Sequence, residues 1–332
     1  MTKFFDQIII IAVAACGLVA CTARTEYRTI EGATHTYYRI KYSSNHPLDT
    51  EIKQLMSQYY RSINPFDSTS IITAVNNNVC LKTDSLFSRA FRSSENIFRA
   101  TQGMFDPTCA PFINYWGFGF KKNNPDAHGG IDSLRQFVGF DKITMKGDSV
   151  IKKDPRVMLN FSAIGDGFLC DLIAELLERN DIHDYLVDVG GEMRAAGVNP
   201  KGNPWTVGIN KPVDDSLGVN HDIVKMLSLK RKTGIATSGN YRNFHVQNGK
   251  KLAHTINPIT GMPAETDILS ATVMAPDATT ADGFATAFMA MGREKAKIMA
   301  QRHPELAYCF IYADEQGNFA CDISPNMAPF IK

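Results

Sequence analysis

Helical and strand-like segments are interleaved along this chain without the strict alternation that builds a parallel sheet with crossover helices. Apolar residues at helical spacing mark residues 48–63, 86–98, 164–177 and 280–292. Strand-forming runs bounded by turn residues mark 36–42, 185–189, 205–209, 224–229, 242–247, 268–275 and 306–312. Residues 142–161 are expected to form a hairpin that turns at 146–149, and residues 121–130 an exposed loop. This order predicts an α+β fold with mixed β-sheets and packed helices.

The charge of the chain is almost balanced. Among its 332 residues, 35 are basic and 34 are acidic, so the formal net charge is +1. This balance gives no reason to expect nucleic acid as a partner or electrostatic adsorption to anionic lipid. We expect a single folded domain over residues 32–332, which is long enough to bury a large core.

The N-terminal segment has the pattern of a bacterial lipoprotein signal. Apolar or small residues run from Ile8 to Ala20, which is signal-peptide length and too short for a stable membrane anchor. Leu18-Val19-Ala20-Cys21 matches a lipobox, so residues 1–20 are predicted to be removed and Cys21 to be acylated. Residues 21–31 would then be a tether on the periplasmic side of the cell envelope, at the inner or outer membrane. An ordinary secretory signal and an uncleaved helix are the alternatives.

Five cysteines remain once Cys16 leaves with the signal and Cys21 carries lipid. They are Cys80, Cys109, Cys170, Cys309 and Cys321. Their odd number and the absence of CxxC spacing argue against a zinc site. The last two flank a hairpin-like turn at 314–318, where either a disulfide across two strands or two buried thiols fits the spacing.

Two segments near the C-terminus carry side chains suited to phosphate chemistry. Asp282 and Thr286 are expected one turn apart on the same face of the helix at 280–292, where a carboxylate and a hydroxyl can hold magnesium. An aspartate favoured by the helix dipole beside a packed threonine is the structural alternative. His254 precedes an Asn-Pro…Thr-Gly turn at 257–261, and an imidazole there suits general-base catalysis. A half-buried structural histidine is its alternative.

Seven motifs, taken in order, carry a resemblance to a known family. They are Phe105-Asp106-Pro107-Thr108, Trp116-Gly117-Phe118-Gly119, residues 162–167 (SAIGDG), residues 187–192 (VDVGGE), residues 237–241 (TSGNY), residues 254–261 (HTINPITG) and Ala281-Asp282 with Thr286. The chain resembles the FAD:protein FMN transferases, the ApbE-type lipoproteins, from about Thr34 to Gly292. Members of that family use magnesium to split FAD and to attach FMN through a phosphodiester to a Ser or Thr of another protein. Some members hydrolyse FAD to FMN and AMP.

The resemblance implies a cofactor, partners and site residues. Residues 32–332 would be the catalytic domain, with Mg²⁺ as cofactor, FAD as substrate and an exported or membrane flavoprotein with an exposed Ser/Thr as acceptor. His254 matches the family base. The residues that match metal contacts are Asp282, Thr286 and the main-chain oxygens of Ala163 and Ala285. The residues expected to contact FAD are Phe66, Met104, Phe105, Asp106, Asn160, Asp166, Ser238, Gly239, Ile256 and Thr260. The turn residues among them, such as Thr260, also fit turn chemistry alone.

Two of the departures from the family pattern bear on FAD binding; the others are Thr34-His35, where many members have Met-Gly, and Asn257, where they have Asp. Asn160 stands where most members have an aspartate, and Asp166 stands where most have a lysine. A unit charge pair about 4 Å apart at an effective dielectric constant of about 20 is worth about 4 kcal/mol. A carboxylate in place of an ammonium near a diphosphate is therefore expected to weaken or reshape FAD binding. A FAD diphosphatase and a FAD-binding lipoprotein without catalysis are the alternative functions.

Overall fold

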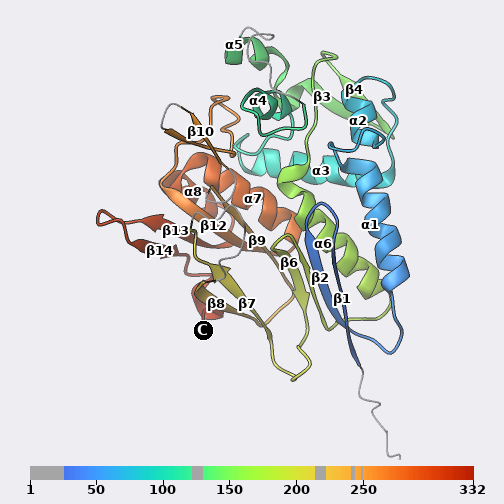
Figure 1. Cartoon of the computed structure of the whole chain (residues 1–332), viewed down its shortest axis with the longest axis vertical. Coiled ribbons are helices and arrows are strands. Elements are labelled where there is room, and N and C mark those ends of the chain that lie inside the picture. The colour runs from blue at the N-terminus through green and yellow to red at the C-terminus, as the bar shows by residue number, and fades with distance from the viewer. Residues whose placement is uncertain (1–25, 122–129, 214–221, 241–243, 248–249) are drawn as a thin grey trace, which may run out of the picture.

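An eight-stranded antiparallel sheet forms the centre of the molecule (Figure 1). The computed structural model describes residues 26–121, 130–213, 222–240, 244–247 and 250–332. The strands, in spatial order, are β1 (Tyr27–Ala33), β2 (Tyr37–Ser43), β5 (Tyr185–Val189), β6 (Glu192–Ala196), β9 (Thr233–Gly239), β12 (Ile268–Ala275), β13 (Ala307–Ala313) and β14 (Phe319–Ile323). Neighbouring strands are antiparallel throughout this sheet.

Helices cover one face of the sheet. The helices of this layer and its margin are α1 (Asp49–Ile63), α3 (Ser85–Ala100), α6 (Ser162–Arg179), α7 (Ala278–Met291) and α8 (Arg293–Gln301). In Figure 1, α7 lies in front of β9 and β12, and these elements are in contact. Every residue of α7 is buried except Thr280 and Thr286. A helix that is enclosed on all sides in this way provides a fixed platform for the side chains it carries.

A second, smaller apolar core lies against the opposite face of the sheet. The hairpin of β7 (Trp205–Asn210) and β8 (Ile223–Leu229) and the C-terminal turn η4 (Ala328–Phe330) contribute to it. Side chains of β13 alternate between the two cores, with Phe310 in the helical core and Cys309 and Ile311 in the smaller one. This period of two is what a strand covered on both faces requires.

Shorter elements complete the described chain. They are α2 (Ile71–Asn76), α4 (Ala110–Tyr115), α5 (Gly130–Leu134), η2 (Arg135–Phe137), η3 (Phe140–Lys142), β3 (Ile143–Lys146), β4 (Ser149–Lys152), β10 (Phe244–Gln247) and β11 (Lys250–Ala253). Within the described ranges, no helix has the length and apolar character needed to cross a membrane.

The α+β prediction is confirmed, and the strands predicted at 185–189 and 268–275 have the predicted bounds. The predicted tether at 21–31 is wrong over its second half, because β1 begins at Tyr27 and pairs with β2. This strand lies at the sheet edge and buries only Ile30, so it lacks a strong apolar alternation. The second arm of the predicted hairpin ends at Lys152 instead of residue 161. The predicted signal peptide, most of the loop at 121–130 and the start of the strand at 242–247 lie outside the described residues.

The cysteines are thiols in the part of the chain that the structure describes. Cys309 pairs with Ile323 and Cys321 with Ile311, so the two thiols are diagonal neighbours on adjacent strands. Burial raises the pKa of Cys309 to about 12. Of the two arrangements that the spacing allowed, the structure contains the thiol pair.

The close approach of α6 and α7 generates a stability prediction. A Cβ at Gly167 would lie 2.4 Å from the carbonyl oxygen of Ala278, whereas one at Gly165 would meet only the hydroxyl of Tyr59, at 2.9 Å. Gly167→Ala must therefore push the helices apart, and overpacking of this kind typically lowers the free energy of unfolding by about 1–3 kcal/mol. Urea denaturation should show a larger loss for Gly167→Ala than for the control Gly165→Ala. Equal losses would contradict a backbone contact at Gly167.

Candidate functional site

A cavity of about 420 Å³ lies where several separate segments of the chain meet. Among them are the start of α6, the middle of α7, the start of β6, the end of β9, and the residues after α1, α3, α4 and β11. Twelve of the residues predicted for the site line this cavity. They are Phe66, Met104, Phe105, Asp106, Asn160, Ala163, Ser238, Gly239, His254, Ile256, Asp282 and Thr286. Segments distant in sequence therefore form one cavity that contains the predicted base and the predicted metal-binding side chains.

Helix α7 supplies a carboxylate and a hydroxyl to the cavity. Asp282 is 6% exposed, and its Oδ2 accepts a hydrogen bond from the Gly167 amide at 3.2 Å. Thr286 follows one turn later, and its hydroxyl oxygen lies 3.3 Å from that of Ser238 on β9. The prediction that Asp282 and Thr286 share one helix face is confirmed, because both line the cavity. Ser238 adds a third oxygen to this group.

The electrostatic character of the cavity is acidic. Asp106, Glu192 and Asp282 line it, and none of its described lining residues is a lysine or an arginine. Burial raises the pKa of Asp282 and Glu192 well above the usual carboxyl range, and the nearby charge of Asp166 raises both further. Burial likewise raises the pKa of Asp166 to about 6. The described lining residues therefore offer no positive charge to an anion such as a diphosphate, and a bound cation would favour the ionised form of these carboxyls.

The oxygen donors fit a cation that binds through few protein ligands. Among the described residues, no three His, Cys, Asp or Glu side chains are grouped as a metal site. A cation here would therefore take one carboxylate, hydroxyls and backbone carbonyls, and complete its shell with water and phosphate oxygens. Magnesium is bound in this way, because it usually keeps several waters and uses one or two carboxylates.

His254 comes directly after β11 and lines the cavity together with Phe118. The imidazole and the Phe118 ring have centroids 6.3 Å apart and meet edge to face. Phe118 belongs to the Trp-Gly-Phe-Gly motif, which the sequence analysis singled out without giving it a role. This edge-to-face contact favours one orientation of the imidazole beside the Phe118 ring.

The turn after His254 is fixed by hydrogen bonds to distant segments. Asn257 Oδ1 accepts from the amides of Ile259 and Thr260, and its Nδ2 donates to the Ala290 carbonyl at the end of α7. Trp116 Nε1 donates to the Gly261 carbonyl at 2.8 Å. The turn is thus tied to the helix that carries Asp282 and Thr286, which fixes the segment that follows His254 relative to them.

The segment after α3 forms another wall. Asp106 Oδ1 accepts from both the amide and the hydroxyl of Thr108, at 2.7 and 2.6 Å.

Phe66 lies in the loop after α1 and is 61% exposed, so its ring can stack on a planar ligand. Asn160 also lines the cavity, and its Oδ1 accepts a hydrogen bond from the backbone amide of Ser162 at the start of α6. The Asn160 side chain therefore has a structural role as well.

Three predicted site residues lie elsewhere, and a fourth is outside the described residues. Asp166 lines an adjoining cavity with Tyr59 and Tyr60, and Thr260 is an exposed turn residue whose hydroxyl accepts from the Met262 amide. Ala285 is buried within α7, and Cys21 is outside the described residues. For Thr260 the structure therefore supports the alternative of turn chemistry.

Other lining residues carried no predicted role. They are Pro107, Cys109, Ile113, Phe118, Ser162, Glu192, Thr237, Thr255 and Pro258. Several of them, including Glu192 and Thr237, belong to the quoted motifs. The motifs therefore mark, in the sequence, several of the segments that line the cavity. The sequence does not show which side chains of a motif face the cavity, because that depends on the fold.

Burial of Asp106 generates a pH-dependent prediction. Its pKa is raised from 3.8 to about 6 by burial. A carboxyl group with a higher pKa in the folded state favours folding while it is protonated, and this advantage is lost as the pH rises from about 4 to about 6. Asp106→Asn should therefore gain stability relative to wild type across that window, by up to about 3 kcal/mol at neutral pH. Urea denaturation at several pH values measures this difference, and a difference independent of pH would contradict the assignment.

Comparisons with known proteins place the chain in one family. A family model described as the ApbE family matches residues 34–310. A Haemophilus influenzae protein named FAD:protein FMN transferase is 31% identical over 333 residues, covering 95% of this chain and 94% of that protein. A protein of the same name from Escherichia coli strain K12 is 35% identical over 245 residues, covering 72% and 68%. The structure of flavin transferase ApbE from Vibrio cholerae matches with a TM-score of 0.78 and 28% identity, covering 92% of this chain and 99% of that one. The apo structure of flavinyl transferase ApbE from Pseudomonas stutzeri matches with a TM-score of 0.81 and 26% identity, covering 92% and 97%.

Proposed function

Because the chain belongs to the ApbE family, we propose that it is a transferase that moves FMN from FAD to a Ser or Thr hydroxyl of an acceptor protein. One observation carries the proposal. A single cavity contains the His254 imidazole, the Asp282 carboxylate and the hydroxyls of Thr286 and Ser238, with no lysine or arginine among its described lining residues. This arrangement suits a reaction in which a cation meets a diphosphate beside a base.

Magnesium fits the donors of this cavity. Asp282, Thr286 and Ser238 would hold the ion, with the Ala163 and Ala285 carbonyls as further candidates. When bound, the cation would neutralise the diphosphate and stabilise the charge that develops on the leaving phosphate. The three acidic lining residues offer the diphosphate no positive charge of their own, so the cation would supply it.

His254 would accept the proton of the acceptor hydroxyl. The hydroxyl oxygen forms a bond to the phosphorus on the FMN side, and the bond from that phosphorus to the bridging oxygen breaks. AMP leaves with the electron pair of that bond, while the hydroxyl proton passes to the imidazole. General-base catalysis of this kind typically contributes about 10²–10⁴-fold to the rate.

The flavin nucleotide would lie between Phe66 and the segment Met104–Asp106. The exposed Phe66 ring offers a stacking surface, and Met104 and Phe105 offer apolar contacts. Asp166, which replaces the family lysine, lies in the adjoining cavity. The diphosphate thus has no side-chain ammonium to contact among the described lining residues, and its binding would depend more strongly on the metal.

We also propose that the protein acts in the cell envelope, anchored by lipid at Cys21. The lipobox at residues 18–21 supports this location. Residues 22–26 separate Cys21 from β1, and a fully extended segment of that length spans at most about 18 Å. The catalytic domain would therefore lie next to the membrane, where an exported or membrane flavoprotein can serve as acceptor.

Replacing the proposed base tests the reaction. His254→Ala should lower flavin transfer at least about 100-fold, within the range of general-base contributions, while FAD binding is retained. The measurement is flavin fluorescence on a denaturing gel after FAD, Mg²⁺ and enzyme are incubated with membrane and exported proteins from cells that lack this gene. His303→Ala is the matched control, because His303 contacts Glu305 and the Ala100 carbonyl outside the cavity. Undiminished labelling by His254→Ala would contradict the role of the base, and release of FMN and AMP without labelled protein would favour the diphosphatase.

A second prediction concerns the cation. Asp282→Asn keeps an oxygen that can accept from Gly167 but loses the charge, so the Mg²⁺ concentration for half-maximal AMP release should rise about tenfold or more. Asp184→Asn is the control, because Asp184 also accepts a backbone amide, that of Val198, outside the cavity. An unchanged Mg²⁺ dependence in Asp282→Asn, or full activity in excess chelator, would contradict the proposed metal site.

A further inference from the structure

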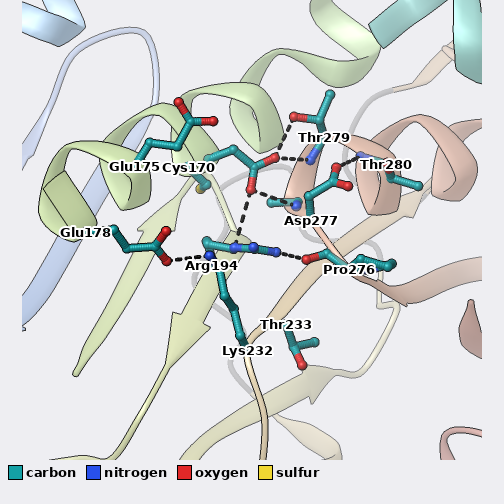
Figure 2. Close-up of polar contacts among 12 residues, drawn as sticks. Cys170, Glu175, Glu178, Arg194, Lys232, Thr233, Pro276, Asp277, Thr279 and Thr280 are labelled. Atoms are coloured by element: carbon teal, nitrogen blue, oxygen red, sulfur yellow. Dashed lines mark hydrogen bonds and ion pairs between the residues drawn. The ribbon is translucent and has the colours of Figure 1, made fainter. Parts of the chain in front are cut away.

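Helix α7 begins with its first three amides bound to carboxylates. Asp171 of α6 accepts from the amides of Ala278 and Thr279 at 3.0 and 2.8 Å, and also from the Thr279 hydroxyl at 2.6 Å. Asp277 accepts from the Thr280 amide at 2.7 Å (Figure 2). Carboxylates are favoured at a helix N-terminus because they meet free amides and the positive end of the helix dipole. Asp171 differs from an ordinary cap because it belongs to a different helix.

A buried arginine completes this group. Arg194 on β6 has its Nε 3.6 Å from Asp171 Oδ1. Its Nη1 donates to the Pro276 carbonyl just before α7 (Figure 2). Asp171 and Arg194 are each 8% exposed. An ion pair this deeply buried is weak evidence for added stability, because desolvation of the two charges offsets their attraction.

The contacts between α6 and α7 follow one another at intervals of one turn. Asp171 lies one turn after Gly167 on α6, and Thr279 lies about one turn before Asp282 on α7. The Gly167 amide donates to Asp282, so the contacts of Asp171 and the contact at Asp282 occupy neighbouring turns of the same helix pair. Apolar packing around α7 resists separation of the helices but acts without direction. Hydrogen bonds to fixed amides are directional and set the register.

We propose that Asp171 is a positioning residue that sets the register of α7 on α6 and thereby places Asp282 and Thr286 opposite the start of α6 for cation binding. This inference rests on the proposed function, since it assigns Asp171 a part in the cation site described above. Asp171 itself is not among the residues that line the cavity. Residues that orient metal ligands without touching the metal typically change affinity about 10–100-fold when replaced.

The test is a binding titration on the full chain in the presence of FAD. Mn²⁺ serves as the probe, and electron paramagnetic resonance measures the free ion, so the result does not depend on turnover. Asp171→Asn should weaken Mn²⁺ binding about 10–100-fold. Asp84→Asn is the matched control, because Asp84 likewise accepts from a backbone amide and a hydroxyl, those of Phe87 and Ser62, but caps its own helix α3 away from the cavity. The control should bind Mn²⁺ as wild type does.

A second pair of variants decides the question if Asp171→Asn fails to fold. Thr279→Val removes only the hydroxyl bond to Asp171, whereas Thr279→Ser retains it. Thr279→Val should bind Mn²⁺ more weakly than wild type, whereas Thr279→Ser should bind it as wild type does. Destabilised variants that bind Mn²⁺ as tightly as wild type would overturn the inference and leave Asp171 as a structural cap. A wild-type protein that binds no Mn²⁺ with FAD would instead overturn the cation site of the proposed function, and the inference with it.

Discussion

The contact between α6 and α7 holds the candidate site together. It depends on the absence of a side chain at Gly167, which lets the backbone of α6 reach Ala278 and Asp282 on α7. One helix then presents its N-terminal turn with Ala163 to the cavity, and the other presents Asp282 and Thr286. Because α7 is buried on nearly every side, these groups lie on a part of the fold that has little freedom to move.

The charge distribution explains why such a platform is needed. Three acidic side chains line the cavity, and burial raises the pKa of Asp282 and Glu192 because water no longer stabilises their charges. Buried carboxylates are unfavourable unless a cation or hydrogen-bond donors compensate them. For Asp282 the fold supplies the Gly167 amide as a donor, and the proposed magnesium would supply the remaining compensation. Substrate charge and protein charge would then be neutralised by the same ion.

The central sheet gives this arrangement its support. It is covered by helices on one face and by the β7–β8 hairpin on the other, so its strands are held from both sides. β9 ends at the cavity with Ser238 and Gly239, and β6 begins there with Glu192. A strand terminus that emerges from a doubly covered sheet is a rigid place from which to present a hydroxyl or a carboxylate.

The sequence by itself determined the class of fold, most of the elements and the identity of the family, because apolar periodicity and ordered motifs are local properties. It also placed Asp282 and Thr286 on one helix face, since that relation requires only the helical repeat. Only the tertiary structure decided that Thr260 and Asp166 lie outside the cavity, that residues 27–31 form an edge strand, and that Asp171 holds the start of α7. Each of these relations joins residues that are distant in the chain, such as Asp171 and Thr279. They follow from the packing of helices and strands against one another, and no local sequence pattern encodes that packing.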